Sequence, residues 1–180
     1  MITVNMADGF EEMEAITVID LLRRADIDVV IVSIMGRKQV TSARNIRIEA
    51  DELFEDVDYD DCEMMVFPGG GGGARNLDNH EGVVKMIKEF NDSKKWIAAI
   101  CAAPMILGHH HILDGRKATI YKGMEDELLG ATYVDEKVVV DGQIISSQGP
   151  ATAIEFSLKI IEVLKGKEKA AAVATALLFD

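Results

Sequence analysis

Short apolar runs alternate with segments of helical spacing through most of this chain. The strand-like runs are, in chain order, 2–6, 27–34, 63–67, 96–100 and 117–121, with a short extra run at 46–48. The helix-like segments are 11–25, 81–91, 151–164 and 167–178, and a further helix that starts at Ala102. Near the end of the chain, Asp141-Gly142 separates two β-branched runs, which predicts a hairpin.

This alternation predicts an α/β fold. Strands that alternate with helices form right-handed βαβ units and a mainly parallel sheet that is covered on both faces. Neither a linker nor an internal repeat interrupts the pattern, so we expect a single domain over residues 1–180 that ends in a terminal helix at 167–178. In such open sheets the functional site lies beyond the carboxyl ends of the strands. The turns 6–14, 67–73 and 100–104 should therefore meet.

Cys101 stands at the junction of one predicted strand and one predicted helix. It follows the apolar run 96–100 and precedes Ala102, Ala103 and Pro104, and a proline in the first turn is typical of a helix start. The sulfur would lie near the first backbone N–H groups of that helix, whose partial positive charge favours a thiolate. This is a nucleophile elbow with sulfur in place of a serine oxygen. A small core cysteine is the alternative.

Glu14 interrupts an otherwise apolar stripe on the first predicted helix. Val18, Leu21 and Ala25 follow it at positions i+4, i+7 and i+11. An unpaired charge is costly to bury, so a buried carboxyl tends to keep its proton and can then donate a hydrogen bond to a thiolate. The alternative is an ordinary acid near a helix start, where a negative charge suits the helix dipole.

Five consecutive glycines, 69–73, follow the strand at 63–67. They also fit a G-x-G-x-x-A dinucleotide pattern, but such a run satisfies many patterns and here follows a middle strand. We interpret the run as a loop whose free N–H groups form an oxyanion hole beside Cys101. A flexible turn is the alternative.

The four histidines give neither a metal site nor an evident general base. His109, His110 and His111 are consecutive and so point in different directions on a helix, where they suit the negative end of its dipole. His80 precedes a helix and is expected at the surface. A thiol hydrolase normally needs a histidine base, and none is obviously placed to face Cys101.

Charge and cysteine content narrow the possible partners and the compartment. The formal net charge of −12 argues against general binding to nucleic acid or to an anionic membrane surface. With two cysteines, Cys62 and Cys101, no disulfide framework is indicated and a reducing cytoplasm is the default. The N-terminus lacks the pattern of a signal peptide. The apolar stretch 170–179 is too short to cross a bilayer.

Several motifs together resemble the ThiJ/PfpI superfamily, in the branch of the parkinsonism-associated deglycase and its bacterial YajL-like relatives. The resemblance covers essentially the whole chain. The matching segments are 7–14 with Asp20, Arg23 and Arg24, then 67–70, 74–77, 98–104, and 149–152 with Glu155 and Phe156. It implies a flavodoxin-like three-layer α/β/α sandwich with a cysteine elbow, a homodimer, and no cofactor or metal.

The resemblance also implies roles for individual residues. Cys101 matches the reactive, easily oxidised thiol, and Glu14 matches the protonated glutamate that hydrogen-bonds its sulfur. Gly70 and Ala102 match the pair of backbone N–H groups around it. Pocket residues that the resemblance adds are Gly149 and Pro150 in a lining loop, and the basic residues Arg24 and Arg44 near the pocket and dimer interface, which suit a small anion.

At two positions this chain carries a different residue from the one that active members of the resembled superfamily carry. Tyr121 stands where relatives with glyoxalase or deglycase activity commonly carry a histidine, and a phenol with an ordinary pKa of about 10 is a poor base near neutral pH. Ala102 stands where the protease branch carries a histidine, so protease activity is not expected.

Two functions from different classes follow. The first is a cysteine-dependent enzyme that acts, with weak turnover, on small reactive carbonyl compounds or on their adducts with amines or thiols. The second is a redox sensor or stress chaperone in which oxidation of Cys101 is the event and turnover is slight. Nucleotide binding through the glycine run is a third and weaker interpretation.

Overall fold

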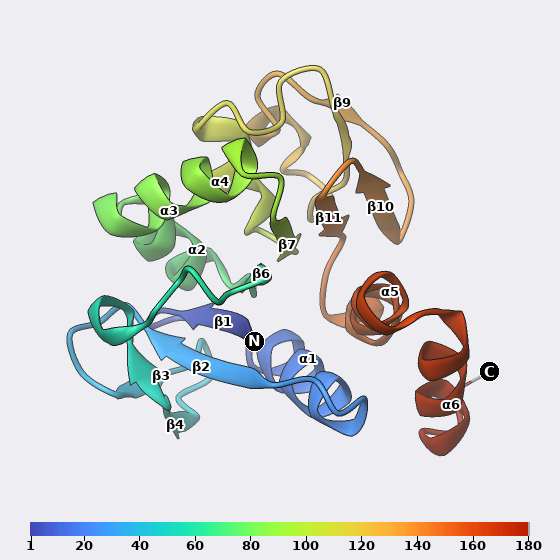
Figure 1. Cartoon of the computed structure of the whole chain (residues 1–180). Coiled ribbons are helices and arrows are strands. Elements are labelled where there is room, and N and C mark those ends of the chain that lie inside the picture. Colours follow the sequence, from blue (N-terminus) through green and yellow to red (C-terminus); the bar gives the residue numbers. More distant parts are fainter. Residues whose placement is uncertain (180) are drawn as a thin grey trace.

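A seven-stranded sheet forms the centre of the computed structural model, which describes residues 1–179 (Figure 1). Its strand order is β10-β11-β7-β6-β1-β2-β5, and every neighbouring pair is parallel except β10 and β11. The strands are β1 Ile2–Met6, β2 Val29–Ser33, β5 Glu52–Leu53, β6 Met64–Phe67, β7 Trp96–Ile100, β10 Val138–Asp141 and β11 Ile144–Ser147. The expected Asp-Gly hairpin is thus the one antiparallel pair of this sheet.

Helices cover both faces of the sheet, as the alternating pattern predicts (Figure 1). They are α1 Glu12–Arg24, α2 Gly71–Asp78, α3 Glu81–Asp92, α4 Pro104–His109, α5 Ala153–Lys165 and α6 Lys167–Ala176. Helices α1 and α5 pack together on one face and α6 packs on α5, whereas α2 packs with α3 and α4 on the other. The fold is a flavodoxin-like three-layer α/β/α sandwich, and the predicted fold class is confirmed.

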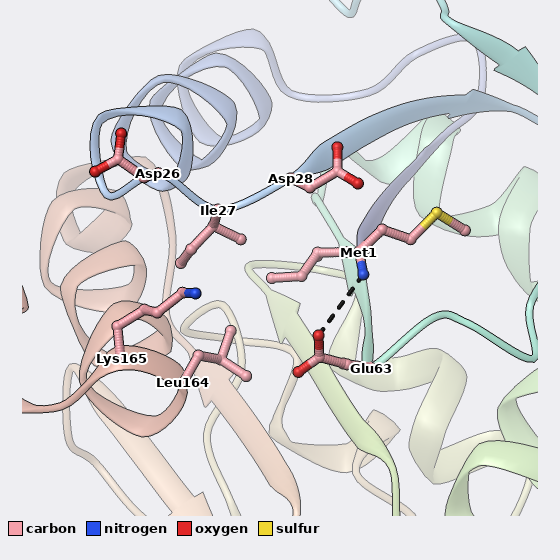
Figure 2. A pocket seen from close by; sticks show the side chains of 8 residues that line it. Met1, Asp26, Ile27, Asp28, Glu63, Leu164 and Lys165 are labelled. Carbon is pink, nitrogen blue, oxygen red and sulfur yellow. Dashed lines mark ion pairs between the residues drawn. The ribbon is translucent and has the colours of Figure 1, made fainter.

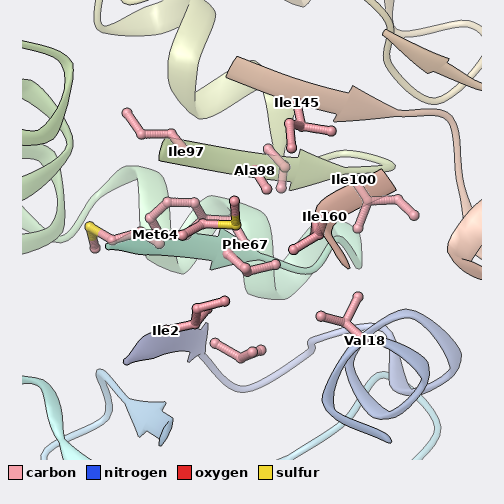
Figure 3. Close-up of a cluster of buried hydrophobic side chains, with 14 of the residues drawn as sticks. Ile2, Val18, Met64, Phe67, Ile97, Ala98, Ile100, Ile145 and Ile160 are labelled. Carbon is pink, nitrogen blue, oxygen red and sulfur yellow. The ribbon is translucent and has the colours of Figure 1, made fainter. Parts of the chain in front are cut away.

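The core lies on both sides of the central strands. Every residue of β1 and β6 is buried. All four residues of β6 are apolar, as expected for a strand covered on both faces, whereas β1 also buries Thr3 and Asn5, whose Nδ2 donates to Thr3 Oγ1 at 3.0 Å. Figure 3 shows side chains of β1, β6 and β7 in one cluster, joined by Val18 from α1 and Ile160 from α5. The strand ends that carry the functional turns are therefore set in a rigid frame.

Two small sheets lie outside this frame. One pairs β3 Gln39–Thr41 with β4 Arg47–Glu49, close to the extra run expected at 46–48, and the other pairs β8 Lys117–Ala118 with β9 Thr132–Tyr133. The strand expected over 117–121 is thus only two residues long. Beyond it, backbone N–H groups bond elsewhere: that of Thr119 donates to Ser146 Oγ at 3.0 Å and that of Tyr121 to Cys101 O at 2.9 Å.

Three 3₁₀ turns complete the element order: η1 Phe54–Asp56, η2 Glu125–Glu127 and η3 Pro150–Thr152. The helix expected from residue 151 therefore begins as η3 and becomes α-helical at Ala153. Over residues 1–179, no helix combines the length and apolar character that crossing a membrane requires.

Candidate active site

Cys101 occupies a strained turn between β7 and α4. Its φ of +63° is left-handed, a conformation that costs a non-glycine residue roughly 1–2 kcal/mol. Two backbone hydrogen bonds hold it there, because its N–H donates to Ser147 O and its carbonyl accepts from Tyr121 N–H, both at 2.9 Å. Pro104 is the first residue of α4. The strand, the sharp turn and the helix together form the predicted elbow.

The turns expected to meet do so around Gly69. Its N–H donates to Glu14 Oε2 at 2.7 Å, and its carbonyl accepts from Glu11 N–H at 2.9 Å. A Cβ placed on Gly69 would lie 2.5 Å from Cβ of Cys101 and 2.8 Å from Glu14 Oε2. Only glycine allows the carboxyl and the thiol to approach this closely.

Glu14 is fully buried, and burial is the main cause that raises the pKa of its carboxyl, to about 7. The neighbouring Cys101 thiol and the hydrogen bond from the Gly69 N–H act against this rise. The other oxygen of Glu14, Oε1, has no hydrogen-bond partner among the described residues. The Cys101 thiol nevertheless lies close enough to change the pKa of the Glu14 carboxyl. Glu14 can therefore hold a proton that it can give to a neighbouring atom.

The Cys101 thiol is not made acidic by its turn alone, which corrects the expectation from the helix N-terminus. Burial, followed by the negative charge of an ionised Glu14, raises the pKa of the thiol to about 12. The backbone N–H groups of Gly70 and Ala102 act in the opposite direction and lower the pKa of the thiol, but they do not outweigh these causes. Once Glu14 is protonated the repulsion is gone, so the two groups titrate as a pair.

A cavity of about 320 Å³ opens onto the sulfur. Its walls are formed by Glu11, Arg44, Gly70, Gly71, Cys101, Ala102, Tyr121, Met124 and Pro150. Arg44 Nη1 lies 3.6 Å from Glu11 Oε1 and is the cation of this cavity. Most of the predicted site residues are thus brought together, with Glu14 buried directly behind the sulfur.

Arg24 and Gly149 do not line this cavity. Arg24 ends α1, ten residues and therefore about 15 Å along the helix axis from Glu14, and its Nε donates to Asp20 at 2.8 Å. This corrects its expected place beside the pocket of the same chain. Gly149 lines an adjacent cavity that shares Tyr121 and Pro150 with the first.

The glycine run is not the expected loop. Gly70 has a φ of +88° and precedes α2, and Gly71 to Gly73 form the first turn of that helix. A Cβ on Gly73 would lie 2.8 Å from the backbone of Phe10. The absence of side chains lets α2 approach the turn before α1, and this close approach places Gly70 beside Cys101 in the wall of the cavity.

The histidines have structural partners, as expected. His109 bridges two carboxylates, with Nδ1 2.8 Å from Asp78 Oδ2 and Nε2 2.7 Å from Glu127 Oε2. Although burial opposes it, hydrogen bonds to these two acids raise the pKa of His109. His80 caps α3, because its Nδ1 accepts from Val83 N–H at 3.1 Å. Within residues 1–179, no cluster of three or more His, Cys, Asp or Glu side chains could hold a metal ion.

Sequence reasoning did not name Glu11, Gly69, Gly71 or Met124 as individual site residues. Gly69 could have been found, since a glycine directly after a strand and Pro68 is where backbone must pass close to a neighbour. Met124 lines the cavity from an irregular segment before η2, and no periodic pattern marks it.

A smaller cavity of about 190 Å³ lies at the opposite, amino-terminal edge of the sheet (Figure 2). The Met1 ammonium lies 3.6 Å from Glu63 Oε1, and the exposed Asp26 pairs with Lys169 at 2.7 Å. Neither cysteine lines this cavity. It therefore lacks the nucleophile and the buried acid of the first.

Comparisons with known proteins agree with the fold and with the sequence motifs. Residues 1–163 match the model of the DJ-1/PfpI family. Protein dj-1beta of Drosophila melanogaster is 41% identical over 177 residues, which cover 97% of this chain and 95% of that protein. The solved structure of Toxoplasma gondii DJ-1, oxidized, superposes with a TM-score of 0.95 at 37% identity and covers 99% of this chain and 97% of that one.

Two further relatives differ in length or in name. Protein DJ-1 homolog B of Arabidopsis thaliana is 38% identical over 98% of this chain, but this chain spans only 41% of that protein. A Caenorhabditis elegans relative that is 34% identical over 88% of this chain and 85% of its own length bears the name glutathione-independent glyoxalase DJR-1.2.

Proposed function

The chain belongs to the DJ-1/PfpI family, and we propose that it is a cysteine-dependent enzyme that acts on reactive carbonyl compounds or their adducts with amines or thiols. A relative named as a glyoxalase supports this substrate class. The observation that carries the proposal is the convergence of Cys101 and Glu14 on Gly69 beneath a cavity. The nucleophile Cys101, the proton carrier Glu14 and the backbone N–H groups of Gly70 and Ala102 would then lie around the carbonyl group of a bound substrate.

For an α-oxoaldehyde the chain's own groups suffice for a balanced reaction. The Cys101 thiolate adds to the aldehyde carbon, and Glu14 gives its proton to the resulting oxygen while the N–H groups of Gly70 and Ala102 stabilise it. Glu14 then removes the hydrogen of the former aldehyde carbon as a proton, and the hydroxyl proton on that carbon passes to the ketone oxygen, which gives an enediol stage. Glu14 returns its proton to the former ketone carbon, and the oxygen left on the former aldehyde carbon becomes the thioester carbonyl.

These proton shifts oxidise the aldehyde carbon to a thioester on Cys101 and reduce the ketone carbon to an alcohol. Water hydrolyses the thioester, which releases a 2-hydroxy acid and restores the thiol. The net reaction adds one water to the oxoaldehyde, and no external oxidant or reductant is needed. Arg44 at the cavity wall suits the anionic product.

The decisive experiment measures lactate formation from methylglyoxal by the purified protein. Cys101→Ala should lower kcat/KM by at least about 10³-fold, because it removes the nucleophile. Cys62→Ala is the matched control and should leave turnover unchanged, since Cys62 lies away from the cavity. Equal turnover by the wild type and Cys101→Ala would exclude this function.

Tyr121 sets the expected rate. It lines the cavity at the place where relatives with this activity commonly carry a histidine. General acid–base help typically contributes about 10²–10⁴-fold. Tyr121→His should therefore raise kcat, whereas a wild type that already turns over as fast as histidine-bearing relatives would show that Tyr121 or Glu14 suffices.

Oxidation of Cys101 is a second candidate function, favoured by the donors that surround the sulfur. Two peroxide molecules convert a thiolate to a sulfinate with release of two waters, and the sulfinate oxygens need hydrogen-bond donors. A protonated Glu14 and the N–H groups of Gly70 and Ala102 can supply them. Loss of one such bond to a charged group costs about 1.5–3 kcal/mol.

Mass spectrometry after graded peroxide tests this candidate. Glu14→Leu should shift the product at Cys101 away from the sulfinate, whereas Glu81→Ala, which removes a first-turn acid of α3, should not. An unchanged oxidation pattern in Glu14→Leu would mean that Glu14 does not stabilise the oxidised sulfur.

We further propose that the protein is a homodimer. On α1, Met13 and Ile16 are 59% and 44% exposed, and Ile46, between β3 and β4, is 49% exposed. Large apolar side chains at such exposure suit burial against a second copy. Sedimentation at micromolar concentration should give a dimer, and Ile16→Glu should weaken it. A wild-type monomer would contradict the proposal.

A further inference from the structure

A second cavity of about 510 Å³ adjoins the cavity at Cys101. Its lining residues are Tyr121, Lys122, Asp135, Gln148, Gly149, Pro150, Ala151 and Thr152. Tyr121 and Pro150 belong to both cavities. A ligand with its reactive carbon at the sulfur can therefore extend past the tyrosine ring into this second space, whose volume is within the range of small-molecule sites.

Gly149 places the tyrosine ring that divides the two cavities. A Cβ on Gly149 would lie 3.4 Å from Cδ2 and 3.7 Å from Cε2 of Tyr121, so one edge of the ring lies against this glycine. The side chain of Tyr121 is nevertheless half exposed. The Tyr121 ring thus separates the two cavities only in part. The second cavity is open to solvent, and the far end of a ligand can lie in it.

Two opposite charges face this cavity without pairing with each other. Among residues 1–179, Lys122 makes no ion pair and no side-chain hydrogen bond. Its charge is felt by Glu125, whose pKa is lowered mainly by the hydrogen bond from the Gly123 N–H and in smaller part by Lys122. Asp135 Oδ1 accepts from Gln148 Nε2 at 2.8 Å and from the Tyr133 hydroxyl at 3.2 Å. These bonds fix the Asp135 carboxylate and leave its Oδ2 available.

We propose that this cavity binds the free α-ammonium and α-carboxylate groups of an amino acid whose side chain carries the carbonyl group that reaches Cys101. Asp135 would accept from the ammonium, and Lys122 would donate to the carboxylate. A zwitterion matches a fixed anion and a separate cation, whereas a simple anion or a simple amine would match only one of them. The inference rests on the proposed function, because it names the class of adduct that the Cys101 site takes.

The same geometry selects against residues inside a polypeptide. An internal residue has neither a free ammonium nor a free carboxylate, so it would leave both Asp135 and Lys122 without partners. The proposed site would therefore favour free amino acids over proteins as carriers of the carbonyl group.

Direct binding of stable thioether ketones tests the proposal without turnover. The probes are S-(2-oxopropyl)cysteine, its analogue from cysteamine, its analogue from 3-mercaptopropionate, and its N-acetyl, C-amide derivative. They carry both charges, only the ammonium, only the carboxylate and neither. Isothermal titration should give at least about tenfold tighter binding for the first probe than for any other.

Charge-specific variants make the test sharper. Lys122→Ala should remove the advantage of the probes that carry a carboxylate, and Lys122→Glu should reverse it. Asp135→Ala should remove the advantage of the probes that carry an ammonium. Lys85→Ala, at an exposed lysine of α3 in the other layer, is the matched control and should leave all four dissociation constants as in the wild type.

The outcomes separate this inference from the proposed function. Equal binding of all four probes, or equal effects of the Lys122 and Asp135 variants on every probe, would overturn the amino-acid site. Methylglyoxal turnover combined with such unselective binding would overturn the site alone. Selective binding without any Cys101-dependent turnover would support the site and overturn the enzyme.

Discussion

The two cysteines of this chain are both buried, yet their surroundings differ. Cys62 is 1% exposed, donates from its sulfur to Met64 O at 3.2 Å and lies 3.7 Å from Thr3 Oγ1. Cys101 is 8% exposed, sits in a left-handed conformation and faces a cavity with Glu14 behind it. Burial raises the pKa of both thiols. The difference between them therefore lies in backbone strain, access and a titratable neighbour, not in burial.

Each of these differences costs stability at Cys101 and has no counterpart at Cys62. The left-handed backbone at Cys101 is strained, and the buried Glu14 carboxyl has one oxygen without a hydrogen-bond partner. Position 69 must be a glycine so that the Cys101 thiol and the Glu14 carboxyl can approach each other. Strain and buried charge gather at functional sites because the surrounding frame can bear them. The comparison can be tested by removing these features one at a time.

Glu14→Gln should have the largest effect on stability. The native pKa of Glu14 is raised from 4.5 to about 7, so between these values the native state holds a proton that the unfolded state has released. The free energy of unfolding must then fall as pH rises through this window, by about 3 kcal/mol from this group. Glu14→Gln lacks that group and should lose less stability over the same range.

Urea unfolding of both proteins between pH 4.5 and pH 8 measures this difference. The gap between the two curves should change by about 3 kcal/mol across the window and stay constant above it. Parallel curves would show that Glu14 has an ordinary pKa and is no proton store.

Gly69→Ala should be the next largest effect. Its Cβ would overlap Cβ of Cys101 and Oε2 of Glu14, and such overpacking typically costs about 1–3 kcal/mol. The change should also separate thiol and carboxyl and lower the rate of alkylation at Cys101. Gly72→Ala is a control, because the φ of Gly72 is not left-handed and its Cβ would make only ordinary contacts, the nearest 3.5 Å from Gly9 Cα. Native alkylation kinetics in Gly69→Ala would contradict the claim that the two groups meet there.

Cys62→Ala should have the smallest effect. It removes a buried sulfur and a weak hydrogen bond, at a cost of about 1 kcal/mol. Thermal unfolding should show this modest loss, while the alkylation kinetics of Cys101 stay as in the wild type. A large change at Cys101 would mean that the two thiols are coupled through β6 and β7.

Local sequence was enough for the fold and for the elbow, but not for everything around it. Continuous apolar runs and Pro104 mark the strands and the start of α4 directly. Glycines are poor helix formers, so nothing local predicts that Gly71 to Gly73 begin a helix; the close approach of α2 to Phe10 decides it. Likewise the raised pKa of Cys101 follows from burial and from Glu14, which a turn motif does not contain.

The sequence also did not show how far apart two residues lie in space, or where a strand ends. A motif match gives no distance, so Arg24 was expected near the pocket although α1 carries it about 15 Å from Glu14. Tyr121 is expected at a strand end, but the strand stops at Ala118, and the N–H groups of Thr119 and Tyr121 donate to Ser146 Oγ and Cys101 O instead of to a neighbouring strand. Both corrections come from geometry that neighbouring elements impose.

The central claim is that Cys101 and Glu14 titrate as one pair, and the pH dependence of alkylation at each cysteine tests it most directly. Iodoacetamide labelling, with the adducts mapped by peptide mass spectrometry, should modify Cys101 well before Cys62. The rate at Cys101 in the wild type should rise near pH 7, level off, and rise again only in strongly alkaline solution, because the second proton leaves against the charge of the pair. Glu14→Gln should give a single rise. Identical single-step profiles in both proteins, or faster labelling of Cys62, would contradict the account.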